Sequence, residues 1–217
     1  MGSTQPVAFD DPALRPYLRL PVAFPGERIG LFGGSFNPPH RGHLLVANQA
    51  LRRLRLDRVW WLVTPGNPLK DHSQLAPLRA RIAACEALVT DRSMVVTACE
   101  ATLPTRFTAD TLAHIVGRRR GTRFVWLMGA DSLASFHRWD RWRTIAATVP
   151  FAVVDRPGST LALHSSLAAI ALRRHRVDED DAALLPDKAP PAWTFLHGPR
   201  EAVSSTQLRA AAARGSA

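Results

Sequence analysis

Two histidines lie three residues apart at the end of a glycine- and proline-rich stretch, the run Gly-Gly-Ser-Phe-Asn-Pro-Pro-His-Arg-Gly-His at residues 33–43. Residues three apart on a helix share a face, so His40 and His43 can point into the same space. Paired glycines let a backbone turn sharply and approach a ligand without a Cβ in the way. Imidazoles together with the amides of a helix start suit an anion such as phosphate. The stretch therefore predicts a phosphate-binding turn.

A His-x-x-His pair could also be half of a zinc site. Zinc sites need three or four ligands, and no cysteine or carboxylate stands at suitable spacing nearby. We therefore favour phosphate and expect no dedicated metal site.

A second group of anion-binding residue types lies near the C-terminal end. Ser204 and Gln207 fit a capping box, so a helix should begin there, with Ser205 and Thr206 in its first turn. Arg209 follows on the same face of that helix. Hydroxyls and an arginine at a helix start can hold an anion. Taken alone, the pattern fits ordinary capping beside a surface arginine better.

Strand and helix patterns alternate along the chain and must position these groups. Apolar runs predict strands at residues 28–32, 57–64, 93–98, 122–128, 151–154 and 193–196. Helical spacing predicts helices at about residues 41–55, from Pro77 onward, from Thr108 as a plausible N-cap, at 165–176 and from 204 onward. The alternation predicts a single α/β domain with a doubly wound, mostly parallel, Rossmann-like sheet over residues 27–217. Residues 1–26 have several prolines and no periodicity, so we expect an N-terminal extension on the surface.

Further candidates follow the carboxyl ends of expected strands, where ligands bind in open α/β sheets. Lys70 lies in a loop at residues 65–76 that is long enough to be a binding loop. Asp131 follows the strand at 122–128, and Trp139 comes shortly after it. The simpler alternatives are a surface lysine, a helix N-cap and a core aromatic, respectively.

Composition excludes several classes of protein. The chain has 217 residues, is 46% hydrophobic and has no apolar run long enough to span a membrane, so we expect a folded cytoplasmic protein without a membrane partner. Its two cysteines, Cys85 and Cys99, are expected to be buried free thiols. The formal charge of +10 suits anionic partners, either small phosphates or nucleic acid. The acidic run at 178–181 should be solvated surface.

The 33–43 run closely resembles the signature of the nucleotidyltransferase superfamily, which includes adenylyltransferases and cytidylyltransferases. Asn37 stands where that signature commonly has aspartate, and Pro39 where it has an aliphatic residue. More motifs in the same order resemble its branch of bacterial nicotinate-mononucleotide adenylyltransferases. They are Pro68-Leu69-Lys70, Phe107–Leu112, Gly129-Ala130-Asp131 with Trp139, Arg156-Pro157-Gly158 and Ser204–Arg209.

The resemblance implies transfer of the adenylyl group of ATP to nicotinate mononucleotide, giving deamido-NAD and pyrophosphate in NAD biosynthesis. It implies mononucleotide contacts at Thr108, Asp131 and Trp139, and Mg²⁺ that accompanies ATP and is carried mainly by the phosphates. It leaves a homo-oligomer open. The residues it implies for ATP binding are Gly33, Gly34, Ser35, Phe36, His40, His43, Ser205, Thr206 and Arg209, and those for catalysis are His40, His43, Lys70 and Arg209.

Two rival functions remain at this point. A sister adenylyltransferase would act on nicotinamide mononucleotide or pantetheine phosphate, but the paired glycines and the Ser-Thr-x-x-Arg spacing favour the nicotinate branch. A non-catalytic nucleic-acid-binding domain would need clustered basic residues and exposed aromatics for stacking. Aromatic content is only 7%, so we expect no nucleic-acid partner.

Overall fold

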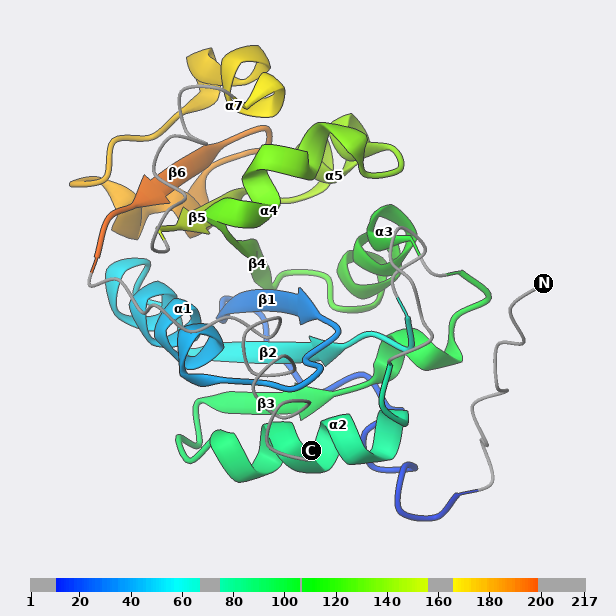
Figure 1. Cartoon of the computed structure of the whole chain (residues 1–217). Coiled ribbons are helices and arrows are strands. Elements are labelled where there is room, and N and C mark those ends of the chain that lie inside the picture. The colour runs from blue at the N-terminus through cyan, green and yellow to red at the C-terminus, as the bar shows by residue number, and fades with distance from the viewer. Residues whose placement is uncertain (1–10, 67–74, 106, 156–165, 199–217) are drawn as a thin grey trace, which may run out of the picture.

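The computed structural model describes residues 11–66, 75–105, 107–155 and 166–198. Six parallel strands form one sheet in the order β3-β2-β1-β4-β5-β6 (Figure 1). The predicted Rossmann-like sheet is thereby confirmed. Its strands are β1 (Arg28–Gly34), β2 (Arg58–Val63), β3 (Met94–Thr97), β4 (Arg123–Gly129), β5 (Phe151–Val154) and β6 (Trp193–Leu196).

The strand order reverses between β1 and β4. β2 and β3 extend the sheet on one side of β1, and β4, β5 and β6 extend it on the other. β1 and β4 pair in register from Arg28 opposite Arg123 to Phe32 opposite Leu127, so their carboxyl ends are neighbours. Doubly wound sheets bind ligands in the crevice outside such a reversal. The histidine-containing turn leaves β1 at this position.

Helices cover both faces of the sheet, and each face has its own buried apolar cluster. Successive strand residues point to opposite faces, so Trp60 belongs to one cluster and Trp61 to the other. In Figure 1, α1 and α3 lie on opposite sides of the central strands. One face carries α1 (Arg41–Arg53), α2 (Leu78–Leu88) and the 3₁₀ turn η4 (Ala182–Asp187). The other carries η1 (Cys99–Thr102), α3 (Thr108–Arg118), α4 (Ala130–Ser135), η2 (Phe136–Arg138), α5 (Trp142–Thr148) and α7 (Leu167–Ala171).

Two predicted helix details are wrong. Thr108 is the first residue of α3, and the N-cap is Phe107, whose extended backbone donates its amide proton to the Thr105 hydroxyl at 3.2 Å. The helix predicted at 165–176 is α7 followed by a separate 3₁₀ turn, η3 (Arg173–His175). Leu172 departs from helical geometry between them, with φ −101° and ψ 14°.

The segment at 11–26 packs against the edge strand β3. Leu14 is buried, and the Tyr17 carbonyl accepts hydrogen bonds from the Ala98 amide and the Thr97 hydroxyl. A boundary at residue 26 stays a prediction. No helix in the described part of the chain has the length and apolar character needed to cross a membrane.

The prediction for the two cysteines is confirmed, and the prediction for the acidic run is wrong in part. Cys85 and Cys99 are buried free thiols, as predicted, and burial raises their pKa values to about 12 and about 11. The acidic run at 178–181 is not wholly solvated. Glu179 pairs with Arg53 at 3.1 Å and with the ring of His197 at 2.6 Å, so it joins α1 to the end of β6.

Candidate functional site

The paired histidines form a reciprocal cap at the start of α1. His40 is the extended N-cap residue, and its Nδ1 accepts the Gly42 amide at 3.1 Å, while Nδ1 of His43 accepts the His40 amide at 3.2 Å. The ring centroids are 3.8 Å apart, which confirms that the two rings share one space. Because each Nδ1 accepts a backbone proton, each neutral ring carries its own proton on Nε2. Both imidazoles are therefore set as Nε2–H donors.

The surroundings of the two rings differ. His40 is only 5% exposed, whereas His43 is half-buried. The ring of His43 packs edge-on against Phe36, with centroids 5.0 Å apart, and is tilted at 6.1 Å from Phe32. This aromatic packing fixes the position of His43 at the carboxyl end of β1.

The two glycines serve packing rather than a turn. Gly33 lies in β1, where an added Cβ would stand 2.4 Å from the Trp126 indole. At Gly34 it would stand 3.0 Å from the ring of Phe36. The left-handed backbone of this turn is at Phe36, with φ 45°, and its ring is buried in the core. The expectation that the glycines make the sharp turn is therefore wrong, because strand geometry continues through both.

A buried arginine that the sequence did not single out ties this turn to its neighbours. Arg81 in α2 is 2% exposed, and its Nη1 donates to the carbonyl oxygens of Ser35 and Thr64, each at 2.7 Å. Its Nε donates to the carbonyl of Ala76 at 2.9 Å, and Nη2 reaches that of Pro65 at 3.4 Å. One guanidinium thus joins the β1 turn to both ends of the segment that connects β2 to α2.

Asn37 adds a second connection to the same segment. Its side-chain oxygen accepts the Ala76 amide at 3.2 Å. Asn37, which stands where the signature it resembles commonly has aspartate, therefore still provides an acceptor. The signal in the sequence for Arg81 is its place next to Ile82 on the apolar face of α2, where an arginine must find buried acceptors.

A buried glutamate is the second residue that the sequence did not single out. Glu100 in η1 is 7% exposed and accepts the Thr111 hydroxyl of α3 at 2.8 Å. Burial is the largest cause that raises its pKa, and hydrogen bonds from Thr111 and Thr64 oppose that shift. Glu100 thereby joins the end of β2 to the helix that follows β3.

The proposed mononucleotide residues all follow carboxyl ends of strands, and so lie at one edge of the sheet. Thr108 is half-buried in the first turn of α3. Asp131 is exposed in the first turn of α4, where Gly129 is the N-cap, so the N-cap alternative for Asp131 is wrong. Trp139 is partly buried and packs edge-on against Phe136 and Trp126, with centroids 5.5 and 6.3 Å away.

Other predicted site residues lie outside the described residues: Lys70, Ser205, Thr206 and Arg209, as well as the motif at 156–158. Within the described ranges, no three His, Cys, Asp or Glu side chains gather closely enough to hold a metal ion.

Comparison with known proteins identifies a family and several similar sequences, which agree with one another. The family model described as cytidylyltransferase-like matches residues 31–211. A probable nicotinate-nucleotide adenylyltransferase of Agrobacterium fabrum is 60% identical over 181 residues, covering 83% of this chain and 97% of the relative. A protein of the same name from Rhizobium meliloti is 61% identical over 183 residues, covering 84% and 97%.

A solved structure supports the fold. The nicotinic acid mononucleotide adenylyltransferase of Plasmodium falciparum, complexed with NaAD, superimposes with a TM-score of 0.63 at 15% identity, covering 85% of this chain and 83% of that one. The family-model match spans most of the chain, and the sequence relatives are matched over nearly their whole length. The chain therefore belongs to the cytidylyltransferase-like family and, within it, to the nicotinate-nucleotide adenylyltransferases.

Proposed function

We propose that this protein transfers the adenylyl group of ATP to nicotinate mononucleotide, giving deamido-NAD and pyrophosphate. The observation that carries the proposal is the pair of imidazoles at the start of α1, at the point where the strand order of the sheet reverses. The names of its relatives agree with this reaction.

The chemistry of the reaction explains these residue types. The phosphate of the mononucleotide is already ionised at neutral pH and attacks the α-phosphorus of ATP in line, so no strong general base is required. What the site must supply is alignment and neutralisation of crowded negative charge. The Nε2–H groups of His40 and His43 donate to phosphate oxygens, and the N-terminal end of α1 adds its dipole. His43 acts mainly on the charge that develops during transfer.

The remaining roles rest on the motifs. Lys70 reaches the phosphates, and Ser205, Thr206 and Arg209 hold the pyrophosphate end of ATP. Asp131 binds a ribose hydroxyl of the mononucleotide, and Trp139 stacks on its pyridine ring beside Thr108. The partial exposure of Trp139 agrees with this role, because a wholly buried indole could not stack on a ligand.

Mg²⁺ enters with ATP as part of the substrate. We expect the phosphates to supply most of its coordination, because Mg²⁺ is usually held by substrate phosphates and water with only one or two carboxylates. Bound there, the ion neutralises charge on the leaving pyrophosphate. A cytoplasmic location stays a prediction.

A comparison of acceptors tests the proposal. Pyrophosphate release should be measured with ATP and, separately, nicotinate mononucleotide, nicotinamide mononucleotide and pantetheine phosphate. The acid mononucleotide should be the preferred acceptor. Equal or better use of the amide, or of pantetheine phosphate, would overturn the assignment of substrate.

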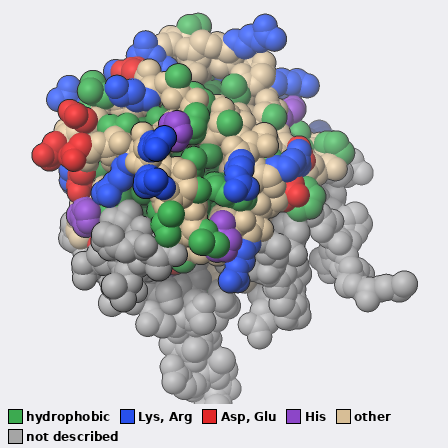
Figure 2. Space-filling view, turned by 90° about the horizontal axis from the view of Figure 1, so that it is seen from above, with side chains coloured by type: hydrophobic (Ala, Val, Ile, Leu, Met, Phe, Trp, Pro, Cys, Tyr) green, Lys and Arg blue, Asp and Glu red, His purple; other side chains and the backbone are tan. Residues whose placement is uncertain are grey.

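The nucleic-acid alternative has less support. On the face in Figure 2, Lys and Arg side chains are spread over the surface rather than gathered along one groove. Nucleic-acid surfaces instead concentrate positive charge along the path of the backbone. Retention of RNA or DNA on a filter at physiological salt would revive this alternative.

A further inference from the structure

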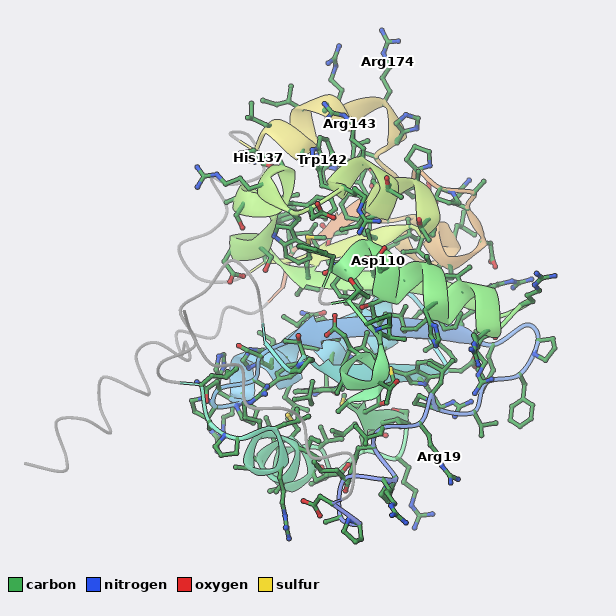
Figure 3. All side chains as sticks on the ribbon, turned by 90° about the vertical axis from the view of Figure 1, so that its right-hand side faces the viewer. Arg19, Asp110, His137, Trp142, Arg143 and Arg174 are labelled. Atoms are coloured by element: carbon green, nitrogen blue, oxygen red, sulfur yellow. The ribbon has the colours of Figure 1, made fainter. Side chains whose placement is uncertain are left out.

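A two-pronged ion pair joins α3 to the turn before α5. Nη1 of Arg141 donates to Oδ1 of Asp110 and Nη2 donates to Oδ2, both at 2.7 Å. The same Oδ2 accepts the Thr105 hydroxyl at 2.7 Å, and Nε of Arg141 donates to Asp140 at 2.6 Å. Planar, bidentate pairing fixes both distance and orientation, as a single point contact cannot. Figure 3 shows Asp110 on α3, below the labelled His137 and Trp142.

The backbone of Arg141 has a conformation that an arginine adopts at a cost. Arg141 has φ 48° and ψ 40°, in the left-handed region that glycine adopts readily and other residues adopt at a cost. Glycine would fit this backbone without strain but could not make the ion pair. The arginine side chain therefore offsets an unfavourable local conformation through its contact with Asp110.

The pair connects two segments that are far apart in the sequence. Asp110 lies in the first turn of α3, two residues after Thr108, and Arg141 lies two residues after Trp139. We propose that Asp110 and Arg141 are positioning residues that set the separation of Thr108 and Trp139 for the pyridine ring of the mononucleotide. This inference rests on the proposed function, because it takes those two residues as the walls of that subsite.

The inference predicts a selective kinetic effect. Arg141→Gly keeps the left-handed backbone without strain and removes only the side chain. Exposed ion pairs are worth up to about 1 kcal/mol, which is about fivefold in an equilibrium constant, so this variant should raise the KM for nicotinate mononucleotide by about threefold to fivefold. The KM for ATP and the kcat at saturation should stay within twofold of wild type. Asp110→Asn should behave alike, and Arg141→Lys should recover part of the loss.

A matched control removes another exposed ion pair. Asp187 pairs with Arg28 at 2.6 Å and with Arg123 at 2.7 Å, at the amino ends of β1 and β4. Asp187→Asn breaks those pairs at the amino ends of the strands, away from the carboxyl ends where the candidate site lies. It should leave the KM values for ATP and for the mononucleotide unchanged. The double variant of Asp110→Asn with Arg141→Gly should match either single variant, because both remove the same contact.

Several results would overturn the inference. An unchanged KM for the mononucleotide in Arg141→Gly would do so. An equal rise in the KM values for the mononucleotide and for ATP would also do so, because it would indicate that the whole site has lost its structure and not one subsite. Multiplicative effects in the double variant would show that the two residues act separately. If wild-type enzyme does not use nicotinate mononucleotide at all, the proposed function fails first and the inference falls with it. Activity in wild type with unaffected variants overturns the inference alone.

Discussion

Replacing Arg81 with methionine would remove the guanidinium that joins three segments around the histidine-containing turn. Methionine keeps much of the length of the side chain and the apolar packing of α2, so the change isolates the polar contacts. Four backbone carbonyls, those of Ser35, Thr64, Pro65 and Ala76, would lose their donor inside the protein.

The magnitude follows from those four contacts. A hydrogen bond from a charged donor contributes about 1.5–3 kcal/mol, and burying the guanidinium costs several kcal/mol in return. We therefore expect the free energy of unfolding to fall by about 3–5 kcal/mol. For a chain of this size each kcal/mol lowers Tm by roughly 2–4 °C, so Tm should fall by about 6–20 °C.

Thermal unfolding followed by circular dichroism at pH 7.5 measures this loss. Arg79→Met is the matched control, since Arg79 lies on the same helix with a side chain that is 69% exposed and only a 3.5 Å contact to Asp11. It should change Tm by less than about 2 °C, as surface changes usually do. A Tm for Arg81→Met equal to that of Arg79→Met would refute the role given to the buried guanidinium.

Three other perturbations have defined outcomes. Arg209→Ala should chiefly weaken ATP binding. If the KM for ATP and the turnover rate were both unchanged, the predicted ATP contact of Arg209 would be wrong and this segment would act only as a helix cap. Burial raises the pKa of Glu100 above the ordinary 4.5, so its contribution to stability is greatest below pH 4.5 and is lost as pH rises through the folded-state pKa. The Tm advantage of wild type over Glu100→Gln should therefore shrink from pH 4.5 to 8, and a constant difference would contradict this. Hydrogen bonds, first from Arg141 and then from Thr105, lower the pKa of Asp110 from 3.8 to about 2. Wild type should be slightly more stable than Asp110→Asn at pH 5, with the difference vanishing near pH 2; a difference that persists there would contradict the ion pair.

Strand positions could be predicted because a parallel sheet buries both faces, which leaves continuous apolar runs such as residues 59–63 and 124–128. The closeness of the His40 and His43 rings is also a local property, but it comes from the reciprocal cap, because His40 is the extended N-cap residue and not part of α1. The order of the strands and its reversal between β1 and β4 result from long-range packing. No local pattern in the sequence encodes them.

The errors also have long-range causes. The local sequence wrongly indicates a turn at Gly33, because the close approach of Trp126 on the neighbouring strand is not visible in it. The only sequence signal for Arg81 is its place on the apolar face of α2, because its acceptors are backbone carbonyls of other segments and carry no sequence signature. Glu100 lacked a signal for the same reason, as its main partner, Thr111, belongs to a different helix.

The central claim is that paired imidazoles at the start of α1 neutralise the phosphates of ATP during transfer. Pyrophosphate release from ATP and nicotinate mononucleotide, compared between wild type and His43→Ala, tests it most directly. Positioned electrostatic groups are worth about 10²-fold or more in rate, so turnover should fall by at least that factor while the variant stays folded. Wild-type turnover in folded His43→Ala would contradict the claim.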